Sequence, residues 1–283
     1  MGVAGYPEGA LRRLQLIELE LLVEIRRVCD ELGLTWFVDS GTCLGAVRHG
    51  GFIPWDDDID VALPLCDYRT FCERAPELLS EEYGLYTHES TPNYPPLWAK
   101  IYRKGTRFMS EQMVESNFEQ GIFVDVFAYC RLDSSSSTAA RQVRGFNFWQ
   151  RASYLYCTSK VKIPANAPCK PLLRAGCACA HKLARAFLSP RLIGERARRS
   201  IARGNGRGDW SDVCYAYFGT FADETLFPTR PMLFEGEEFP VPHDTDAYLR
   251  VFYGNYHELP PESERGACPP RILDFGDGVN VME

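Results

Sequence analysis

The sequence predicts an α/β (α+β) fold, in which a mixed β-sheet is flanked by helices and carries a basic, mainly helical insertion. Two observations support this prediction. Helical and strand-like segments alternate over roughly the first half of the chain, and strand-like composition returns near the C-terminus. Between these parts, residues 141–207 hold fifteen Lys and Arg against one acid, Glu195, a net charge of +14, whereas the remainder carries −21. We therefore divide the chain into a core (1–133), a basic helical insertion (134–210) and a C-terminal part (211–283) that completes the core.

Periodicity and composition predict the individual elements. Apolar residues from Leu14 to Ile25 recur at steps of three and four, as in an amphipathic helix, and Gly33 ends it. Runs rich in β-branched and aromatic residues predict strands, and a proline-rich stretch predicts a loop. The expected helices are 11–32, 42–48, 67–79, 141–156, 172–188 and 244–253. The expected strands are 35–38, 56–63, 83–88, 97–103, 122–127, 213–221 and 232–234. We expect irregular structure at 163–171 and in a tail from Ala267.

Composition is that of a folded protein without a membrane span. At 283 residues, 45% hydrophobic and 24% charged, the chain can bury a substantial core. The first residues lack the apolar stretch of a signal peptide, and no run approaches about 18 uninterrupted apolar residues. The eleven cysteines, without zinc-type spacing, are expected to be free thiols. We expect a cytoplasmic protein that can attach peripherally to the inner face of the membrane.

An acidic stretch at residues 56–60 (DDDID) is the first candidate for chemistry. In an extended chain Asp56, Asp58 and Asp60 point to one side, and the two residues between them point to the other. Three carboxylates on one side repel one another unless a cation neutralises them, and hard oxygen ligands suit Mg²⁺ or Mn²⁺. A solvated acidic turn is the alternative. An EF-hand calcium loop is excluded, because Val61 stands where that loop requires glycine.

Other segments supply candidate partners for this stretch. Gly41 and Thr42 belong to a tight turn into a helix, whose first backbone N–H groups can hold a phosphate, and Arg48 at the end of that helix can clamp a diphosphate. Asp125 lies in an apolar run and needs a partner: a metal shared with the acidic stretch, a helix cap or a salt bridge. Lys100, on a predicted strand, can reach a phosphate from the sheet. A solvated surface position is the alternative for both Arg48 and Lys100.

The segment GTCLGAVRHGGFIPWDDDIDVAL (41–63) closely resembles the signature of the LicD family, whose bacterial members are phosphocholine transferases and whose relatives include the fukutin-type phosphosugar transferases. The resemblance continues through residues 100–103, through GIFVDVF at 121–127 and into the block 234–261. The same residues match the pattern of the nucleotidyltransferase superfamily: a Gly-Ser or Gly-Thr turn, a D-x-D on a strand and a third carboxylate on a later strand. The resemblance implies a nucleotidyltransferase-like sheet.

The resemblance also implies a reaction and its residues. The donor would be CDP-choline or a similar CDP-alcohol, and the acceptor a hydroxyl of a cell-surface glycan of lipopolysaccharide or teichoic acid type, free or lipid-linked. Phosphocholine would be transferred and CMP released, with Mg²⁺ or Mn²⁺ as the cofactor. The implied catalytic and metal-binding residues are Asp58, Asp60 and Asp125, with Asp56 as a further metal ligand, and the implied donor-binding residues are Gly41, Thr42, Arg48 and Lys100. Asp125 would hold a second metal ion or accept the proton of the attacking hydroxyl.

Three other functions are compatible with the same residues. A nucleotidyltransferase that transfers NMP, or a glycosyltransferase with a D-x-D motif, would share the acidic site. A non-enzymatic scaffold would bind polyanions or membrane through residues 141–207. In that region the basic amphipathic segment 172–188 can lie on an anionic membrane, hold an anionic polymer or cover a core. We expect no nucleic-acid partner, because no recognised binding motif accompanies the basic residues.

Overall fold

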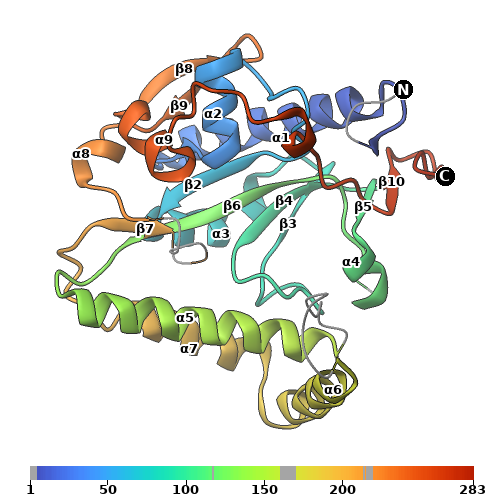
Figure 1. The fold of residues 1–283 in the computed structure, drawn as a ribbon, viewed down its shortest axis with the longest axis vertical. Coiled ribbons are helices and arrows are strands. Elements are labelled where there is room, and N and C mark those ends of the chain that lie inside the picture. The colour runs from blue at the N-terminus through green and yellow to red at the C-terminus, as the bar shows by residue number, and fades with distance from the viewer. Residues whose placement is uncertain (1–4, 117, 160–169, 213, 215–218) are drawn as a thin grey trace.

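The computed structural model describes residues 5–116, 118–159, 170–212, 214 and 219–283. It confirms the predicted fold class, since a mixed β-sheet in the described residues has helices on both faces (Figure 1). The strand order is β1-β2-β6-β4-β3, and β7 pairs, outside this row, with the C-terminal residues 129–131 of the central strand β6. The strands of this sheet are β1 (Phe37–Val38), β2 (Asp60–Pro64), β3 (Tyr83–Tyr86), β4 (Ala99–Arg103), β6 (Phe123–Arg131) and β7 (Trp210–Asp212).

The central strand β6 brings the predicted site residues into one row. All of its residues except Arg131 are buried, because elements cover both faces of the sheet, and this explains its near-continuous apolar sequence. β6 runs parallel to β2, with Asp125 opposite Asp60, and antiparallel to β4, with Asp125 opposite Lys100. Residues directly opposite each other point to the same face, so these three side chains share one face of the sheet.

One layer consists of α1 (Ala10–Leu32), α2 (Ser40–His49), α9 (Thr245–Tyr253) and a hairpin of β8 (Arg230–Phe234) and β9 (Glu237–Val241) (Figure 1). The apolar stripe of α1 packs into the core, and Gly33 ends the helix in a left-handed conformation, as predicted. The hairpin turn has positive φ at both Glu235 and Gly236, the geometry that matches the twist of the paired strands.

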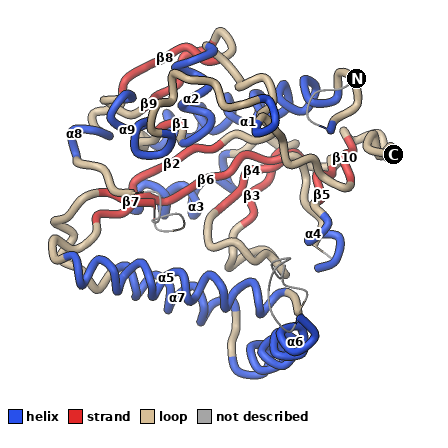
Figure 2. The backbone as a smooth tube through the Cα atoms, in the orientation of Figure 1, coloured by secondary structure: helices blue, strands red, loops and turns tan. Residues whose placement is uncertain are grey.

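The opposite layer contains α3 (Leu65–Leu78), α5 (Ser136–Cys157) and α7 (Pro190–Ile201). Figure 2 shows α5 and α7 alongside each other, with α6 (Lys170–Phe187) at their end. Helices α5, α6 and α7 make up the basic insertion. The boundaries of the insertion with the core remain a prediction. Two short helices, α4 (Glu111–Ser116) and α8 (Asp223–Leu226), lie in connections.

The tail differs from the expectation of irregular structure. Residues Ile272–Asp274 form β10, which pairs with β5 (Arg107–Met109). Leu273 is fully buried, and the Asp274 carboxylate accepts hydrogen bonds from Arg107 and from the backbone of the following turn. The expected strand 213–221 and the expected loop 163–171 fall mostly outside the described residues, although Phe221 forms a β-bridge with Trp210.

Candidate active site

The acidic stretch is irregular from residue 56 to 59, and β2 begins only at Asp60, so the expected strand over the whole stretch is wrong. The alternation of side chains nevertheless holds. Asp57 turns away from the others and accepts hydrogen bonds from the Tyr6 hydroxyl (2.7 Å) and the Cys268 backbone N–H (3.0 Å). Ile59 is fully buried in the core. The remaining acids of the stretch are only partly accessible and act on one another electrostatically.

Asp56, Asp58, Asp60 and Asp125 form one group, which we call the acidic cluster. Desolvation raises the pKa of Asp56, Asp58 and Asp60, and the neighbouring carboxylates raise it further. Asp125, although remote in sequence, contributes to this repulsion at Asp58 and Asp60. Asp56 and Asp58 lie close enough for each carboxyl group to affect the pKa of the other. The cluster therefore concentrates negative charge where protein atoms limit the access of water.

Asp125 has protein partners in the structure. The Lys100 ammonium lies 2.7 Å and 2.9 Å from its two carboxylate oxygens, and the Trp98 indole N–H donates to it at 2.5 Å. Lys100 is also buried over the Phe123 ring, 3.4 Å from its centroid. Of the protein partners considered for Asp125, the salt bridge is present, and the shared metal ion stays a prediction. Lys100, which the resemblance placed at the donor phosphates, is held in this ion pair.

Gly41 and Thr42 support the acidic cluster from the start of α2. The Thr42 hydroxyl accepts a hydrogen bond from the Asp60 backbone N–H (2.9 Å), which fixes the first residue of β2. A Cβ added to Gly41 would lie 3.1 Å from an Asp56 carboxylate oxygen, so the missing side chain leaves room for that carboxylate. Both residues thus lie beside the acids, in positions that set the geometry of the cluster.

Arg48 lies on another side of the cluster and has an unused donor. Its Nη1 donates to the Tyr256 carbonyl (3.1 Å), but its Nε is buried without a hydrogen-bond partner among the described residues. Asp56 and the Tyr253 hydroxyl are within its electrostatic reach, and desolvation lowers the pKa of Arg48. Tyr253, which sequence reasoning missed, faces Asp56, Asp58 and Asp60 from α9.

Glu18 is a second residue that sequence reasoning missed. It lies on α1, is 1% exposed, and its Oε2 has no hydrogen-bond partner in the described part of the chain. Burial raises the pKa of Glu18, followed by repulsion from Asp58, Asp57, Asp56 and Asp125. The sequence did contain a signal, because Glu18 interrupts the buried side of an amphipathic helix between Leu14 and Leu21, where an apolar residue is the rule.

Asp39 is a third missed residue, with different surroundings. It caps α2, and its carboxylate accepts hydrogen bonds from the Ser40 backbone N–H (2.8 Å), the Tyr129 hydroxyl (3.0 Å) and the Tyr248 hydroxyl. It is 1% exposed, and burial is the cause that raises its pKa. These donors join α2, β6 and α9, so Asp39 is a structural anchor beside the acidic cluster.

The donor atoms of the acidic cluster suit a divalent metal ion. The cluster offers only carboxylate oxygens, and the unpartnered Glu18 Oε2 adds a further carboxyl oxygen nearby. Among the described residues, no three His, Cys, Asp or Glu side chains already surround a single metal-sized point. Mg²⁺ is commonly held by one or two protein carboxylates together with substrate phosphates and water, so the residues present fit such an ion in donor type.

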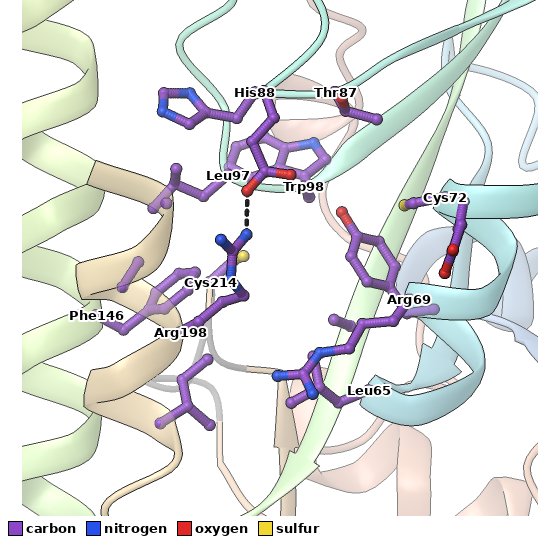
Figure 3. Close-up of a pocket in the computed structure, with 17 residues that line it drawn as sticks. Leu65, Arg69, Cys72, Thr87, His88, Leu97, Trp98, Phe146, Arg198 and Cys214 are labelled. Carbon is purple, nitrogen blue, oxygen red and sulfur yellow. Dashed lines mark hydrogen bonds and ion pairs between the residues drawn. The ribbon is translucent and has the colours of Figure 1, made fainter. Parts of the chain in front are cut away.

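A cavity of about 260 Å³ lies in the opposite layer, between α3, α5 and α7 (Figure 3). Tyr68, Trp98 and Phe146 contribute aromatic walls, and an ion pair between Arg198 and Glu89 crosses one side. None of the predicted site residues lines this cavity. Trp98 links it to the site, since the same indole donates to Asp125.

Comparison with known proteins gives a consistent picture. The LicD/FKTN/FKRP nucleotidyltransferase domain family matches residues 33–163. Lipopolysaccharide cholinephosphotransferase LicD of Haemophilus influenzae is 26% identical over 265 residues, which cover 90% of this chain and 94% of that protein. Shorter similarities join the chain to two mammalian proteins. Mouse ribitol-5-phosphate transferase FKTN is 38% identical over 50 residues (18% of this chain and 11% of that protein), and human ribitol 5-phosphate transferase FKRP is 42% identical over 40 residues (14% and 8%).

Proposed function

Because the chain belongs to the LicD family through the domain at residues 33–163, we propose that it is a phosphotransferase that moves phosphocholine, or a similar phosphoalcohol, from a CDP-alcohol to a hydroxyl of a cell-surface glycan. Similarity to the Haemophilus influenzae cholinephosphotransferase along 90% of the chain supports the reaction type. The observation that carries the proposal is the acidic cluster, in which the Lys100 ammonium contacts Asp125 and the remaining carboxyl groups repel one another.

Asp58 and Asp60, with Asp56 and Asp125 beside them, would hold Mg²⁺ or Mn²⁺. Such an ion would neutralise the carboxylates and the negative charge that grows on the leaving phosphate. The protein's own contribution is to fix these oxygens: Thr42 anchors the backbone of Asp60, Gly41 leaves space for Asp56, and Lys100 fixes the position of the Asp125 carboxylate.

Arg48 is the side chain best placed to bind the donor diphosphate. Its unpartnered Nε and its position near Asp56 put a guanidinium donor beside the cluster, and planar guanidinium groups suit phosphate oxygens. We propose that Gly41 and Thr42 also bind the donor, because they form the start of α2 next to Asp56 and Asp60.

In the proposed reaction the acceptor hydroxyl attacks the phosphorus that bears the alcohol. The new P–O bond joins this phosphorus to the glycan, and the bond from the same phosphorus to the bridging oxygen of the anhydride breaks, so that CMP leaves with that oxygen. The hydroxyl proton passes to a carboxylate, for which we propose Asp125. We place this reaction in the cytoplasm, as the sequence predicts.

The test is product analysis with CDP-choline, CDP-ribitol and CDP-glycerol, each with Mg²⁺ and a lipopolysaccharide or teichoic acid acceptor. We expect CMP release from one donor, lost in Asp58→Asn and retained in Asp57→Asn, a matched control one residue away that points toward Tyr6. Release of CDP would indicate transfer of the alcohol without its phosphate, and release of the free phosphoalcohol without CMP would indicate NMP transfer. Either result, or equal CMP release by the two variants, would contradict the proposal.

A further inference from the structure

Helix α6 is attached to the protein along one side only. The His181 ring Nδ1 is hydrogen-bonded to the Leu155 carbonyl of α5 (2.7 Å), and the Arg185 guanidinium stacks over the Tyr156 ring, 4.7 Å from its centroid. Ala184 is the only buried residue of α6. These contacts fix the rotation of α6 about its own axis, because they all come from the same part of its surface.

The large apolar side chains of α6 point away from these contacts. Leu172 is 72% exposed, Leu183 59% and Phe187 77%. At about 100° per residue these three lie within roughly 60° of one another, whereas His181 lies on the opposite side of the helix and Ala184 lies about 60° beyond Phe187. Together with Leu173, which is 42% exposed, they form what we call the apolar stripe of α6. It extends over most of the helix, roughly 22 Å between Leu172 and Phe187 at 1.5 Å per residue.

This orientation is the reverse of that in an ordinary surface helix. An amphipathic helix of a globular protein buries its apolar side and exposes its polar side. Here the apolar stripe is exposed, and such a concentration of exposed apolar side chains is typical of an interaction surface. The alternative that segment 172–188 covers a core holds only for its small residues, since Cys177 and Ala180 are half-buried and Ala184 is buried, whereas the large apolar side chains are exposed.

Charge identifies the occupant of this surface. The helix contains no acid, and its basic residues are Lys170, Arg174, Lys182 and Arg185. The neighbouring α7 adds the exposed Arg191, Arg196 and Arg199. A second copy of the chain would bring the same charges into contact with these, so charge complementarity favours an anionic surface. A helix with leucine and phenylalanine on one side, with Lys182 at the edge of that side and the other basic residues further round the helix, matches the requirements of an anionic lipid surface.

We propose that α6 lies flat on an anionic phospholipid bilayer, with the apolar stripe among the acyl chains and the basic residues at the headgroups. No helix in the described part of the chain is long and apolar enough to cross a bilayer, and the four cations of α6 favour an interfacial position. This inference is independent of the proposed chemistry, because neither the donor nor the acidic cluster enters it.

The experiment is vesicle sedimentation of the full chain at about 0.1 M salt, with vesicles of phosphatidylcholine alone and of phosphatidylcholine with 30% phosphatidylglycerol. We expect wild type to bind the anionic vesicles at least about tenfold more tightly than the neutral ones. The pair Leu183→Ser/Phe187→Ser should weaken this binding at least about tenfold, and Arg174→Gln/Lys182→Gln should weaken it about fivefold. Leu233→Ser is the matched control, because Leu233 is an exposed leucine (56%) on the hairpin of the opposite layer, and its binding should equal that of wild type.

Several results would overturn the proposal. These are failure of wild type to bind anionic vesicles, unchanged binding of the Leu183→Ser/Phe187→Ser pair, and equal loss in the Leu233→Ser control. Sedimentation velocity shows whether the wild type is a dimer. If it is, and if Leu183→Ser/Phe187→Ser dissociates it, the apolar stripe of α6 is instead a contact between two copies of the chain. Circular dichroism checks that each variant is folded, and the substituted side chains are exposed, so folding should be retained. CMP release, measured with a soluble acceptor, should also be unchanged, which separates failure of this proposal from failure of the proposed function.

Discussion

Asp39 and Asp60 are neighbours across β1 and β2, where the Asp39 backbone N–H donates to the Asp60 carbonyl (2.9 Å), yet their carboxylates have opposite surroundings. Asp39 is almost completely buried, and two tyrosine hydroxyls and a backbone N–H donate to it. Asp60 is partly accessible, and among the described residues no group donates a hydrogen bond to its carboxylate, while Asp58 and Asp125 repel it. The difference separates a carboxylate that holds the fold together from one whose charge is left for a ligand.

The largest effect should come from Asp60→Asn. Loss of one charged ligand should lower CMP release from the preferred CDP-alcohol by about 10³-fold, since several kcal/mol of charge stabilisation correspond to such a factor. The thermal unfolding midpoint of the metal-free variant should equal or exceed that of wild type, because repulsion within the acidic cluster is relieved. A variant that loses activity only because it unfolds at a lower temperature would contradict the assignment.

Asp39→Asn should give the opposite pattern. The amide replaces an acceptor of several hydrogen bonds by a group that is part donor, so we expect a loss of about 2 kcal/mol in the free energy of unfolding. Denaturant unfolding monitored by circular dichroism measures this change. CMP release per folded molecule should fall less than about tenfold at a temperature where the variant is folded. If Asp39→Asn abolished activity without loss of stability, the comparison between the two carboxylates would fail.

Glu18→Gln extends the comparison of Asp39 and Asp60 to a third carboxyl group. Glu18 is buried like Asp39, but one of its oxygens has no hydrogen-bond partner in the described residues. A bound Mg²⁺ would favour the charged form of Glu18, so replacing the carboxyl group by an amide should weaken the binding of Mg²⁺ about tenfold, which corresponds to about 1.4 kcal/mol. Isothermal titration calorimetry measures this affinity in the presence of CDP. Unchanged affinity together with a clear loss of stability would instead make Glu18 a structural residue.

The smallest effect concerns pH. In the folded protein Asp56, Asp58 and Asp60 have pKa values above the value near 3.9 that they have in the unfolded chain. Above that pH the folded protein therefore holds more protons than the unfolded chain does at the same pH. The free energy of unfolding of the metal-free protein should therefore fall from pH 5 to pH 8. Mg²⁺ should stabilise the folded protein more at pH 8 than at pH 5, because fewer protons compete with it for the carboxylates. Differential scanning calorimetry tests this, and Asp60→Asn should show a shallower slope than wild type. Equal slopes would contradict the account.

Sequence patterns were sufficient for local structure and for the acids that lie in a motif. The helix ended by Gly33, the turn into α2 and the apolar β6 follow from periodicity and turn chemistry. The ion pair between Lys100 and Asp125 did not follow, because it depends on the register of β4 against β6, which sequence alone does not specify.

Long-range contacts explain the other misses. Glu18 meets the acidic cluster only because α1 packs beside a stretch about forty residues later in the chain. Asp39 depends on hydroxyls from β6 and α9, the second of which is more than 200 residues away. β10 was missed because a three-residue strand has little pattern of its own and is stabilised by its pairing with β5.

Binding of Mn²⁺, counted by electron paramagnetic resonance with CDP present, tests the role of the acidic cluster without any assumption about the acceptor. The account predicts at least one bound ion per chain for wild type and for Asp57→Asn, and none for Asp58→Asn or Asp60→Asn at the same concentrations. Equal occupancy in all four proteins would show that the cation binds elsewhere, and these carboxylates would then have no part in the chemistry we assign to them.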